Sequence, residues 1–288
     1  MIPVLTIFIP TFNRNEMLTK CIQSVEKSVK KANICYEIII VNEAPSEIPV
    51  NLNDDNVKIL NFKKELLPCY AMYYALLNSH GNYFLRIDDD NEIDINLVKR
   101  LYNYISTHND VAYCGALAKT ENGIIANKGT ILSKHLKIAT RDIKIGNVAY
   151  EVDFVDNVYI LNRQRINLEN FYDSCGFFPW SFEDGYDQLS SRQNGYKIVT
   201  LPTAITIHHS HTKNVNLKQV YYYGRSKIIM YKYAYHYSYI VSIFYAIVGF
   251  LYLPVAYKGN LNNILMIYKN YLKGIRDGSK YLKFKNDK

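Results

Sequence analysis

The first 110 residues alternate between short apolar runs and longer stretches whose apolar residues recur at every third or fourth position. Residues 4–9 and 36–41 are apolar and rich in β-branched side chains, which is typical of strands covered on both faces. Between them, apolar residues from position 18 to position 29 form one helical stripe, and Asn13 or Asn15 is expected to cap this helix. The alternation predicts βαβ units and an α/β fold with a mostly parallel sheet flanked by helices.

The same pattern predicts the further elements of the sheet. A short strand is expected at residues 57–60, a helix from Pro68 to Ser79, a strand at 83–87 and a helix at 97–105. Beyond residue 110 the pattern loosens, and strands are expected at 111–117, 123–130, 152–161 (a bent strand or a pair), 197–201 and 204–207. A helix that ends at Asn194-Gly195 precedes the last two strands, and residues 134–144 give no clear signal.

Three consecutive carboxylates, Asp88, Asp89 and Asp90, directly follow the predicted strand at 83–87. They therefore lie at the carboxyl end of a strand, where open α/β sheets bind ligands. On extended backbone Asp88 and Asp90 point to the same side and could hold one divalent cation, and no Lys or Arg follows closely enough to compensate the cluster. The alternative is a solvated turn in which an Asp caps the next helix.

A second set of polar residues lies near the end of the predicted sheet. Glu183 and Asp184 precede a predicted helix, where the helix dipole alone favours acidic residues. They are therefore either ordinary first-turn acids or a catalytic pair. His208, His209 and His211 follow the last predicted strand. Two of them could face one ligand while His209 faces away, although a lone histidine is more often a core or surface residue.

Charge is divided unevenly along the chain. Residues 1–196 carry 20 Lys/Arg and 24 Asp/Glu, whereas residues 197–288 carry 14 and 2, within a net charge of +8. The basic C-terminal third is expected to face nucleic acid, anionic lipid or a phosphorylated substrate. The five cysteines are scattered, which indicates free thiols in a reducing compartment and neither a zinc ribbon nor a disulfide framework. The chain starts without a basic, apolar leader, so no signal peptide is expected.

The C-terminal region, residues 216–288, is expected to be helical, basic and partly apolar. A Tyr- and Lys-rich helix is predicted at 217–235. Residues 237–257 carry no charge, and this length is close to the ~20 residues that cross a bilayer. Gly249 and Pro254 interrupt the run, which favours an in-plane or re-entrant membrane helix over a spanning one, with a buried core helix as the third alternative.

Several segments, taken in order, resemble a known family. The first strand ends in Ile9-Pro10-Thr11-Phe12-Asn13-Arg14, the aspartate triplet has the form of a DXD motif, and Glu183-Asp184 is followed by Arg192-Gln193-Asn194-Gly195-Tyr196. With this order and spacing, roughly residues 3–235 resemble the inverting family 2 glycosyltransferases of the GT-A fold. The resemblance implies a Rossmann-like GT-A domain at 1–215, with a nucleotide-sugar-binding half at 1–110 and an acceptor and catalytic half at 111–215.

The resemblance also implies roles for individual residues. Asp184 resembles the catalytic base, with Glu183 beside it, and Trp180 is suited to stacking on the acceptor sugar. Asp90, with His208 or His211, would bind a divalent metal, Mn²⁺ or Mg²⁺. The donor-binding residues would be Pro10, Thr11, Asn13, Arg14, Asn42, Glu43, Asp88 and Asp89, with Asp88 near the ribose.

Two segments depart from the family pattern. Asn42-Glu43-Ala44-Pro45 stands where the second strand usually ends in Asp-Asp-Gly-Ser, and this leaves the nucleotide base open. The stretch Cys69-Tyr70-Ala71-Met72-Tyr73-Tyr74 replaces the family's Ala-Arg-Asn-Gly segment, so some diphosphate contacts are expected from elsewhere.

Together these features predict a metal-dependent inverting glycosyltransferase that moves a sugar from a nucleotide-diphosphate sugar to a hydroxyl acceptor. Such transfer needs a cation to neutralise the leaving diphosphate and a carboxylate as general base for the hydroxyl. The expected partners are a glycan or lipid-linked acceptor and an anionic membrane surface, not nucleic acid, at the cytoplasmic face of the cell membrane or in the cytoplasm.

Two alternatives differ in class. A nucleotidyltransferase on a related fold would need a Gly-rich, Lys-bearing phosphate loop near the first strand, and the sequence has none. A non-catalytic membrane- or nucleic-acid-binding protein would use the basic C-terminal third, but the uncharged run at 237–257 lies in the middle of that region.

Overall fold

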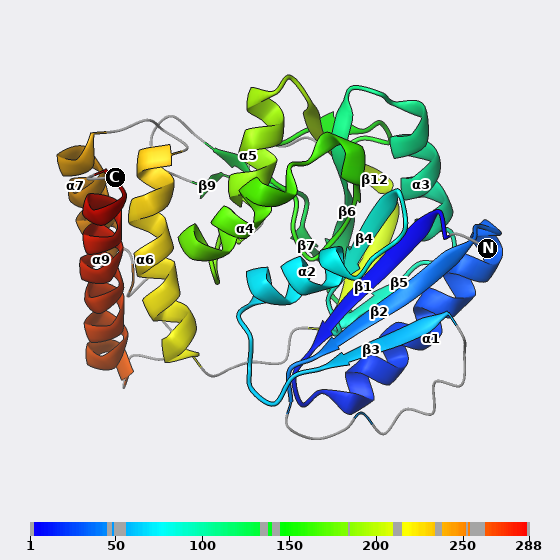
Figure 1. The fold of residues 1–288 in the computed structure, drawn as a ribbon, viewed down its shortest axis with the longest axis horizontal. Helices are drawn as coiled ribbons and strands as arrows, with labels where there is room; N and C mark the ends of the chain where they lie inside the picture. The colour runs from blue at the N-terminus through cyan, green and yellow to red at the C-terminus, as the bar shows by residue number, and fades with distance from the viewer. Residues whose placement is uncertain are drawn as a thin grey trace.

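The computed structural model (Figure 1) describes residues 3–44, 48, 56–132, 138–139, 145–183, 185–209, 215–233, 238–251, 253 and 263–286. Within these residues a large mixed sheet has helices on both faces, and further helices pack together beside it (Figure 1). This architecture confirms the predicted α/β fold with a helical C-terminal region. Asp184 and His211 lie outside the described residues.

The sheet has the strand order β10-β12-β6-β11-β4-β1-β2-β3. Its N-terminal half is parallel, since β1 pairs with both β2 and β4, and β2 pairs with β3. β1 and β2 are almost entirely apolar because both of their faces are covered. The four strands are β1 (Leu5–Thr11), β2 (Tyr36–Asn42), β3 (Val57–Asn61) and β4 (Tyr83–Ile87).

The C-terminal half of the sheet mixes directions. β11 (Val158–Asn162) lies antiparallel between β4 and β6 (Val111–Lys119), while β12 (Lys197–His208) runs parallel to β6. Short antiparallel strands add to it: β5 (Asn91–Ile93) and β10 (Tyr150–Glu151) on β12, and β7 (Ile125–Asn127) on β6. β8 (Ile131–Leu132) and β9 (Ile138–Ala139) form a separate pair.

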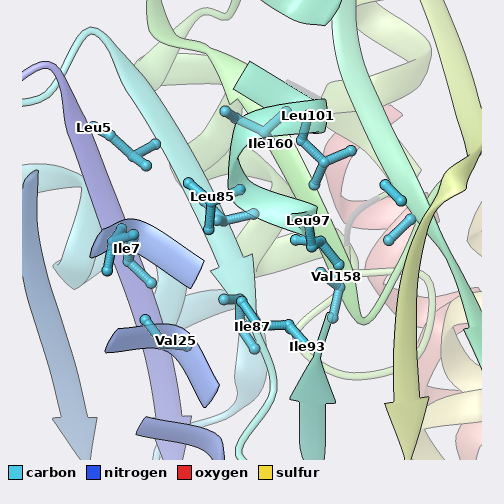
Figure 2. Packing of buried hydrophobic residues seen from close by; sticks show 14 of the residues in the cluster. Leu5, Ile7, Val25, Leu85, Ile87, Ile93, Leu97, Leu101, Val158 and Ile160 are labelled. Atoms are coloured by element: carbon cyan, nitrogen blue, oxygen red, sulfur yellow. The ribbon is translucent and has the colours of Figure 1, made fainter. Parts of the chain in front are cut away.

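Helices bury both faces of the sheet. On one face, Val25, Leu97 and Leu101 pack against Ile7 and Leu85 (Figure 2). On the other face, a second apolar cluster surrounds Phe84 and Tyr159. The helices of the first face are α1 (Asn15–Ala32) and α3 (Leu97–Thr107), and those of the second are α2 (Pro68–Leu77) and α4 (Leu168–Phe177), the latter preceded by a 3₁₀ turn, Arg163–Arg165.

Several local predictions need correction. Arg14, not an asparagine, occupies the N-cap position of α1, and it makes no side-chain capping bond. β12 is one strand where the sequence predicts two, because a register shift between Leu201 and Ile205 absorbs Pro202 without ending the strand. The strand predicted at 123–130 is only the three-residue β7, and most of 134–144 lies outside the described residues. The sequence pattern does not predict α4, which has no clear apolar stripe and contains Gly176.

The C-terminal helices α6 (Leu217–Tyr233), α7 (Tyr239–Phe250) and α9 (Ile264–Asn286) share an apolar core. α6 and α9 approach closely, since a Cβ on Gly274 would lie only 2.1 Å from the backbone oxygen of Tyr221. α6 contacts the sheet domain through Arg225, which donates to the backbone oxygens of Gly176 (2.8 Å) and Phe177 (2.9 Å).

α7 covers much of the uncharged run at 237–257. It has 12 residues, a length of about 18 Å at ~1.5 Å per residue. In the parts of the chain that the structure describes, no helix is long and apolar enough to cross a membrane.

One carboxyl in the sheet domain is buried against a tyrosine. Asp187, on α5 (Gly185–Gln193), is 1% exposed, and its Oδ2 accepts a hydrogen bond from Tyr113 Oη. Its Oδ1 has no hydrogen-bond partner among the described residues, and burial raises the pKa of this carboxyl to about 8. The native state therefore keeps a proton that the unfolded chain, with an Asp pKa of about 4, has lost at neutral pH. The stability contributed by this proton is complete below about pH 4 and is lost as the pH rises through about 8.

Asp187→Asn should remove this pH dependence, because an amide stays neutral and still accepts the Tyr113 hydrogen bond. We expect the free energy of unfolding of the variant, relative to the unmodified protein, to rise between pH 5 and pH 8 by up to about 4 kcal/mol, because each pH unit between the two pKa values contributes about 1.4 kcal/mol. Urea denaturation at several pH values measures this difference, to which groups that titrate equally in both proteins contribute nothing. A difference that stays constant over the range would contradict the titration of Asp187.

Candidate functional site

The candidate site lies where the order of the parallel strands reverses. The chain leaves β1 toward β2 and β3, and then returns to the other side of β1 as β4. In α/β sheets such a switch point opens a crevice at the carboxyl ends of the strands, where ligands bind. Here Pro10 and Thr11 end β1, and the aspartate triplet follows β4.

The triplet forms a turn and does not continue the strand. The backbone N–H of Asn91 donates to the backbone oxygen of Asp88 at 3.0 Å, and the side chains of Asp88 and Asp90 have different partners. Asp88 Oδ1 accepts from Arg86 Nε at 2.9 Å, whereas Asp90 Oδ1 lies 3.6 Å from His208 Nε2. The prediction that Asp88 and Asp90 point the same way is therefore wrong, because it assumed extended backbone through Asp90.

Asp89 joins the ends of β1 and β4. It is only 4% exposed, and its carboxylate accepts from Thr11 Oγ1 at 2.8 Å and from Arg14 Nη1 at 3.0 Å. Burial raises its pKa to about 6, although Arg14 and Thr11 oppose the shift. Asp89 thus holds the crevice together, and its carboxylate is occupied by protein groups.

Two arginines compensate the three carboxylates. Arg14 Nη1 also donates to Asp90 Oδ2 at 2.9 Å, so this guanidinium bridges two members of the triplet. Arg86 is nearly buried within β4, and its Nη2 lies 3.6 Å from Glu183 Oε1 in addition to its bond with Asp88. Sequence reasoning missed the role of Arg86. The signal was a single cation inside an otherwise apolar strand.

His208, the last residue of β12, and His209, which follows it, contact different groups. Interaction with Asp90 raises the pKa of His208 above its ordinary value, against the effect of burial. Burial alone would raise the pKa of Asp90, but His208 and Arg14 outweigh it and hold that pKa below its ordinary value. His209 donates its backbone N–H to the backbone oxygen of Asp90 at 2.8 Å, while its ring pairs with Glu92 and Glu121.

Asp90 and His208 fit a divalent cation as two of its ligands. Neighbouring ligand atoms around Mg²⁺ lie about 3 Å apart, close to the 3.6 Å between Asp90 Oδ1 and His208 Nε2. Within the described residues no group of three or more His, Cys, Asp or Glu side chains is placed to hold a metal. The remaining positions would fall to water and phosphate oxygens, which Mg²⁺ and Mn²⁺ readily keep.

The end of β2 adds a buried acid to the crevice. Asn42 is engaged within the protein, since Oδ1 accepts from the Ala44 N–H at 3.1 Å and Nδ2 donates to Asn61 at 2.8 Å. Glu43 donates its N–H to the Thr11 oxygen at 3.0 Å, and burial raises the pKa of its carboxyl to about 7. Asn42 and Glu43, both predicted to contact the donor, therefore lie beside Thr11. The side chain of Asn42 is hydrogen-bonded within the protein.

Two cavities of about 330 Å³ each adjoin the triplet. The first, the α1 cavity, is lined by Asn13, Arg14, Asn15, Glu16, Met17, Lys20, Asp89, Asp90, Asn91, Glu92, Glu121 and His209. The second, the Glu183 cavity, is lined by Arg86, Asp88, Thr130, Phe154, Val155, Asp156, Asn157, Ser181, Phe182, Glu183, Gly185 and Tyr223. Asp88 thus faces a different space from Asp90.

Unusual backbone conformations gather at these cavities. Non-glycine residues with positive φ include Asn13 (54°), Asn157 (62°), Ser181 (65°) and Phe182 (61°), and each of them lines one of the two cavities. Left-handed backbone costs energy for Ser and Phe, and such strain is typical of functional sites. The strain makes Ser181 and Phe182, just before α5, candidate residues of the functional site.

Glu183 and Asp187, both considered as the general base, differ in how accessible they are. Glu183 is half-buried in its cavity beside Arg86, and Gly185 lines the same cavity. Asp187 is excluded as an accessible base by its burial against Tyr113. Trp180 does not line the cavity; its ring lies 6.2 Å from that of Tyr222, with the Lys218 ammonium 5.6 Å away.

Comparison with solved structures shows the same fold elsewhere. GalNAc-T7, with UDP, GalNAc and Mn²⁺, has a TM-score of 0.58 and 14% identity over 78% of this chain and 47% of its own. TarS 1–349 of S. aureus, with UDP-GlcNAc, has a TM-score of 0.56 and 17% identity over 79% and 66%. The mannosyltransferase PcManGT of Pyrobaculum calidifontis, with GDP-Man and Mn²⁺, has a TM-score of 0.56 and 11% identity over 99% and 87%.

The sequence itself gives the family. The chain spans less than two thirds of GalNAc-T7 and of TarS 1–349, and at these identities the similarity shows the fold alone. A search of curated proteins found no match. The family model described as "Glycosyl transferase family 2" matches residues 6–171, which is more than half of the chain. The chain belongs to glycosyl transferase family 2 and has the GT-A fold.

Proposed function

We propose that this protein is a metal-dependent inverting glycosyltransferase that uses a nucleotide-diphosphate sugar. The observation that carries the proposal is the crevice between β1 and β4, where Asp90 and His208 face each other beside the pair of the buried Asp89 with the half-exposed Arg14. The solved structures with this fold contain UDP, UDP-GlcNAc or GDP-Man, so UDP- and GDP-sugars are the first donors to test.

The donor would lie across the carboxyl ends of β1, β2 and β4. Pro10 and Thr11 provide the end of β1 and Asn13 the turn after it, while Asn42 ends β2 and Glu43 follows it. A neutral Glu43, favoured by its raised pKa, could donate a hydrogen bond to the base or ribose as well as accept one. Arg14 is half-exposed, so it can reach the diphosphate while it holds Asp89 and Asp90 in place. Asp88 would face the sugar side, toward the Glu183 cavity.

The metal would be held by Asp90 and His208, with His211 as a further candidate outside the described residues. A bound Mn²⁺ or Mg²⁺ supplies positive charge that stabilises the leaving nucleoside diphosphate. Arg14 adds a second positive charge at the same edge, because its guanidinium bonds Asp90 through Nη1.

The general base would be Asp184, whose chain neighbours Glu183 and Gly185 both line one cavity. It would accept the proton of the acceptor hydroxyl as that oxygen attacks the anomeric carbon from the face opposite the diphosphate. Glu183 is the alternative base, although it already lies 3.6 Å from Arg86 Nη2. Asp187 is too buried to act as the general base.

The acceptor would enter the Glu183 cavity. Its apolar wall combines Phe154 and Phe182 with Tyr223 of α6, and the rings of Phe182 and Tyr223 stack with centroids 5.8 Å apart. Aromatic faces of this kind suit the apolar face of a sugar. We propose a glycan or lipid-linked acceptor. We also propose a GT-A domain at residues 1–215, to whose acceptor cavity α6 of the region 216–288 adds a wall. The cytoplasmic face of the membrane, or the cytoplasm, is the proposed location.

The proposal is tested by incubating the protein with UDP- and GDP-sugars and Mn²⁺ or Mg²⁺. We expect slow metal-dependent release of the nucleoside diphosphate from one donor, because water can replace the acceptor. A nucleotidyltransferase would instead form pyrophosphate from a nucleoside triphosphate and a sugar phosphate, so a parallel reaction with UTP or GTP and a sugar 1-phosphate tests that alternative. No product from any donor, together with no metal-dependent nucleotide binding, would contradict the proposal.

Asp184→Asn should remove transfer but keep donor and metal binding. The amide cannot accept the hydroxyl proton, so we expect kcat to fall by about 10²–10⁴-fold. Asp110→Asn is the matched control, since Asp110 is an exposed carboxylate paired with Lys197 far from the crevice. Near-normal turnover of Asp184→Asn would transfer the role to Glu183, which Glu183→Gln then tests.

Tyr223→Ala should weaken acceptor binding and leave the donor untouched. Loss of one aromatic face predicts a rise in acceptor KM of roughly three- to tenfold, with donor hydrolysis unchanged. Tyr172→Ala, on an exposed tyrosine of α4, is the control for the loss of a ring. An equal loss of donor hydrolysis in Tyr223→Ala would show that the residue only supports the fold.

A further inference from the structure

α7 exposes a continuous apolar stripe. Ile240 is 77% exposed, Phe244 60%, Ile247 50% and Leu251 71%. Their spacings of four, three and four residues place them on one side of the helix. The opposite side, with Ser242, Ala246 and Gly249, is buried. α7 therefore buries small residues and exposes large apolar ones, the reverse of what an ordinary surface helix does.

α9 lies antiparallel beside α7 and exposes basic residues. Tyr271 Oη donates to the Ala246 oxygen at 2.9 Å, and the rings of Phe250 and Tyr268 are 4.1 Å apart. The exposed residues of α9 share one side of the helix: Leu265, Met266, Lys269, Leu272, Lys273, Arg276 and Lys280.

Because α7 and α9 pack side by side, we group their exposed sides under one name, the α7–α9 face. Gly274 and Gly278 on the other side of α9 pack against the backbone of α6. α6 in turn lies between the sheet domain and α9 (Figure 1). The α7–α9 face thus points away from both α6 and the catalytic crevice.

The α7–α9 face combines exposed apolar side chains with exposed Lys and Arg, and this combination indicates the kind of partner it binds. An exposed stripe of large apolar side chains marks an interaction surface. A second copy of the chain in a symmetric pair would bring the same four cations of α9 against one another, which is unfavourable. An anionic bilayer satisfies both parts, because its interior accepts the apolar stripe and its headgroups attract the Lys and Arg side chains.

We propose that the α7–α9 face docks the protein on an anionic lipid bilayer, with α7 lying in the plane of the interface. The stripe from Ile240 to Leu251 is about 16 Å long, which suits an in-plane helix and is too short to span. If the proposed function holds, docking also places the Glu183 cavity one helix from the membrane, since Tyr223 of α6 lines it. Such a position suits an acceptor that is anchored in the bilayer.

The test is flotation of the full chain with vesicles of phosphatidylglycerol or of phosphatidylcholine, at low and high salt and without donor. We expect binding to phosphatidylglycerol at low salt and at least about tenfold weaker binding to phosphatidylcholine. Two variants remove the two parts of the face: Phe244→Glu with Ile247→Glu, and Lys269→Gln with Lys273→Gln and Lys280→Gln. Each should lose about tenfold or more in vesicle binding, and donor hydrolysis should be unchanged.

Matched controls come from exposed residues on the sheet domain. Ile124→Glu with Val148→Glu replaces side chains that are 67% and 79% exposed, and Lys30→Gln with Lys31→Gln and Lys99→Gln removes three exposed charges. The controls should bind vesicles like the unmodified protein. Full-length protein that ignores anionic vesicles at low salt, or face variants that bind like the controls, would overturn the proposal. So would a dimer in solution that the face variants convert to monomer, because the face would then bind a second copy.

Discussion

Three adjacent carboxylates at the end of one strand repel one another, and the arrangement of the site depends on how this repulsion is compensated. Arg14 pairs with Asp89 and Asp90, and Arg86 pairs with Asp88. An uncompensated buried charge costs several kcal/mol, so each of these pairs constrains the turn. Because Arg14 follows β1 while Asp89 and Asp90 follow β4, the Arg14 pairs also tie the ends of the two strands together.

The turn gives the three aspartates separate surroundings. Asp89 is used inside the protein, Asp90 meets His208 at the crevice, and Asp88 lines the Glu183 cavity. This division separates a side that suits a charged diphosphate from a side with aromatic walls. Tyr223 connects that second side to the C-terminal helices, beyond the residues that match the family. The helices are therefore both a wall of the site and, through the α7–α9 face, its proposed anchor.

Local patterns in the sequence were sufficient for the position of the triplet and for the strands and helices of the first 110 residues except β5, the three-residue strand that directly follows the triplet. β1, β2 and the helix stripe between them are each complete within a short window. The turn after β4 was missed because Arg14, which pairs with Asp89 and Asp90, lies more than seventy positions away in the sequence. The burial of Asp187 was also hidden, since its partner Tyr113 belongs to a strand that only the sheet order brings near α5. Roles that depend on strand order cannot be read from spacing alone.

The most direct test of the account is electron paramagnetic resonance of Mn²⁺ titrated with the full chain and a nucleoside diphosphate, UDP or GDP. When the correct nucleotide is present, the fall in the free Mn²⁺ signal should correspond to one ion bound per chain. The nucleotide is needed because Asp90 and His208 alone supply only two ligands. Asp90→Ala should lose most of this binding, while Asp110→Asn should keep it. Mn²⁺ that stays free with both nucleotides, or that binds equally well to Asp90→Ala, would contradict the placement of the donor and metal at the carboxyl ends of β1 and β4.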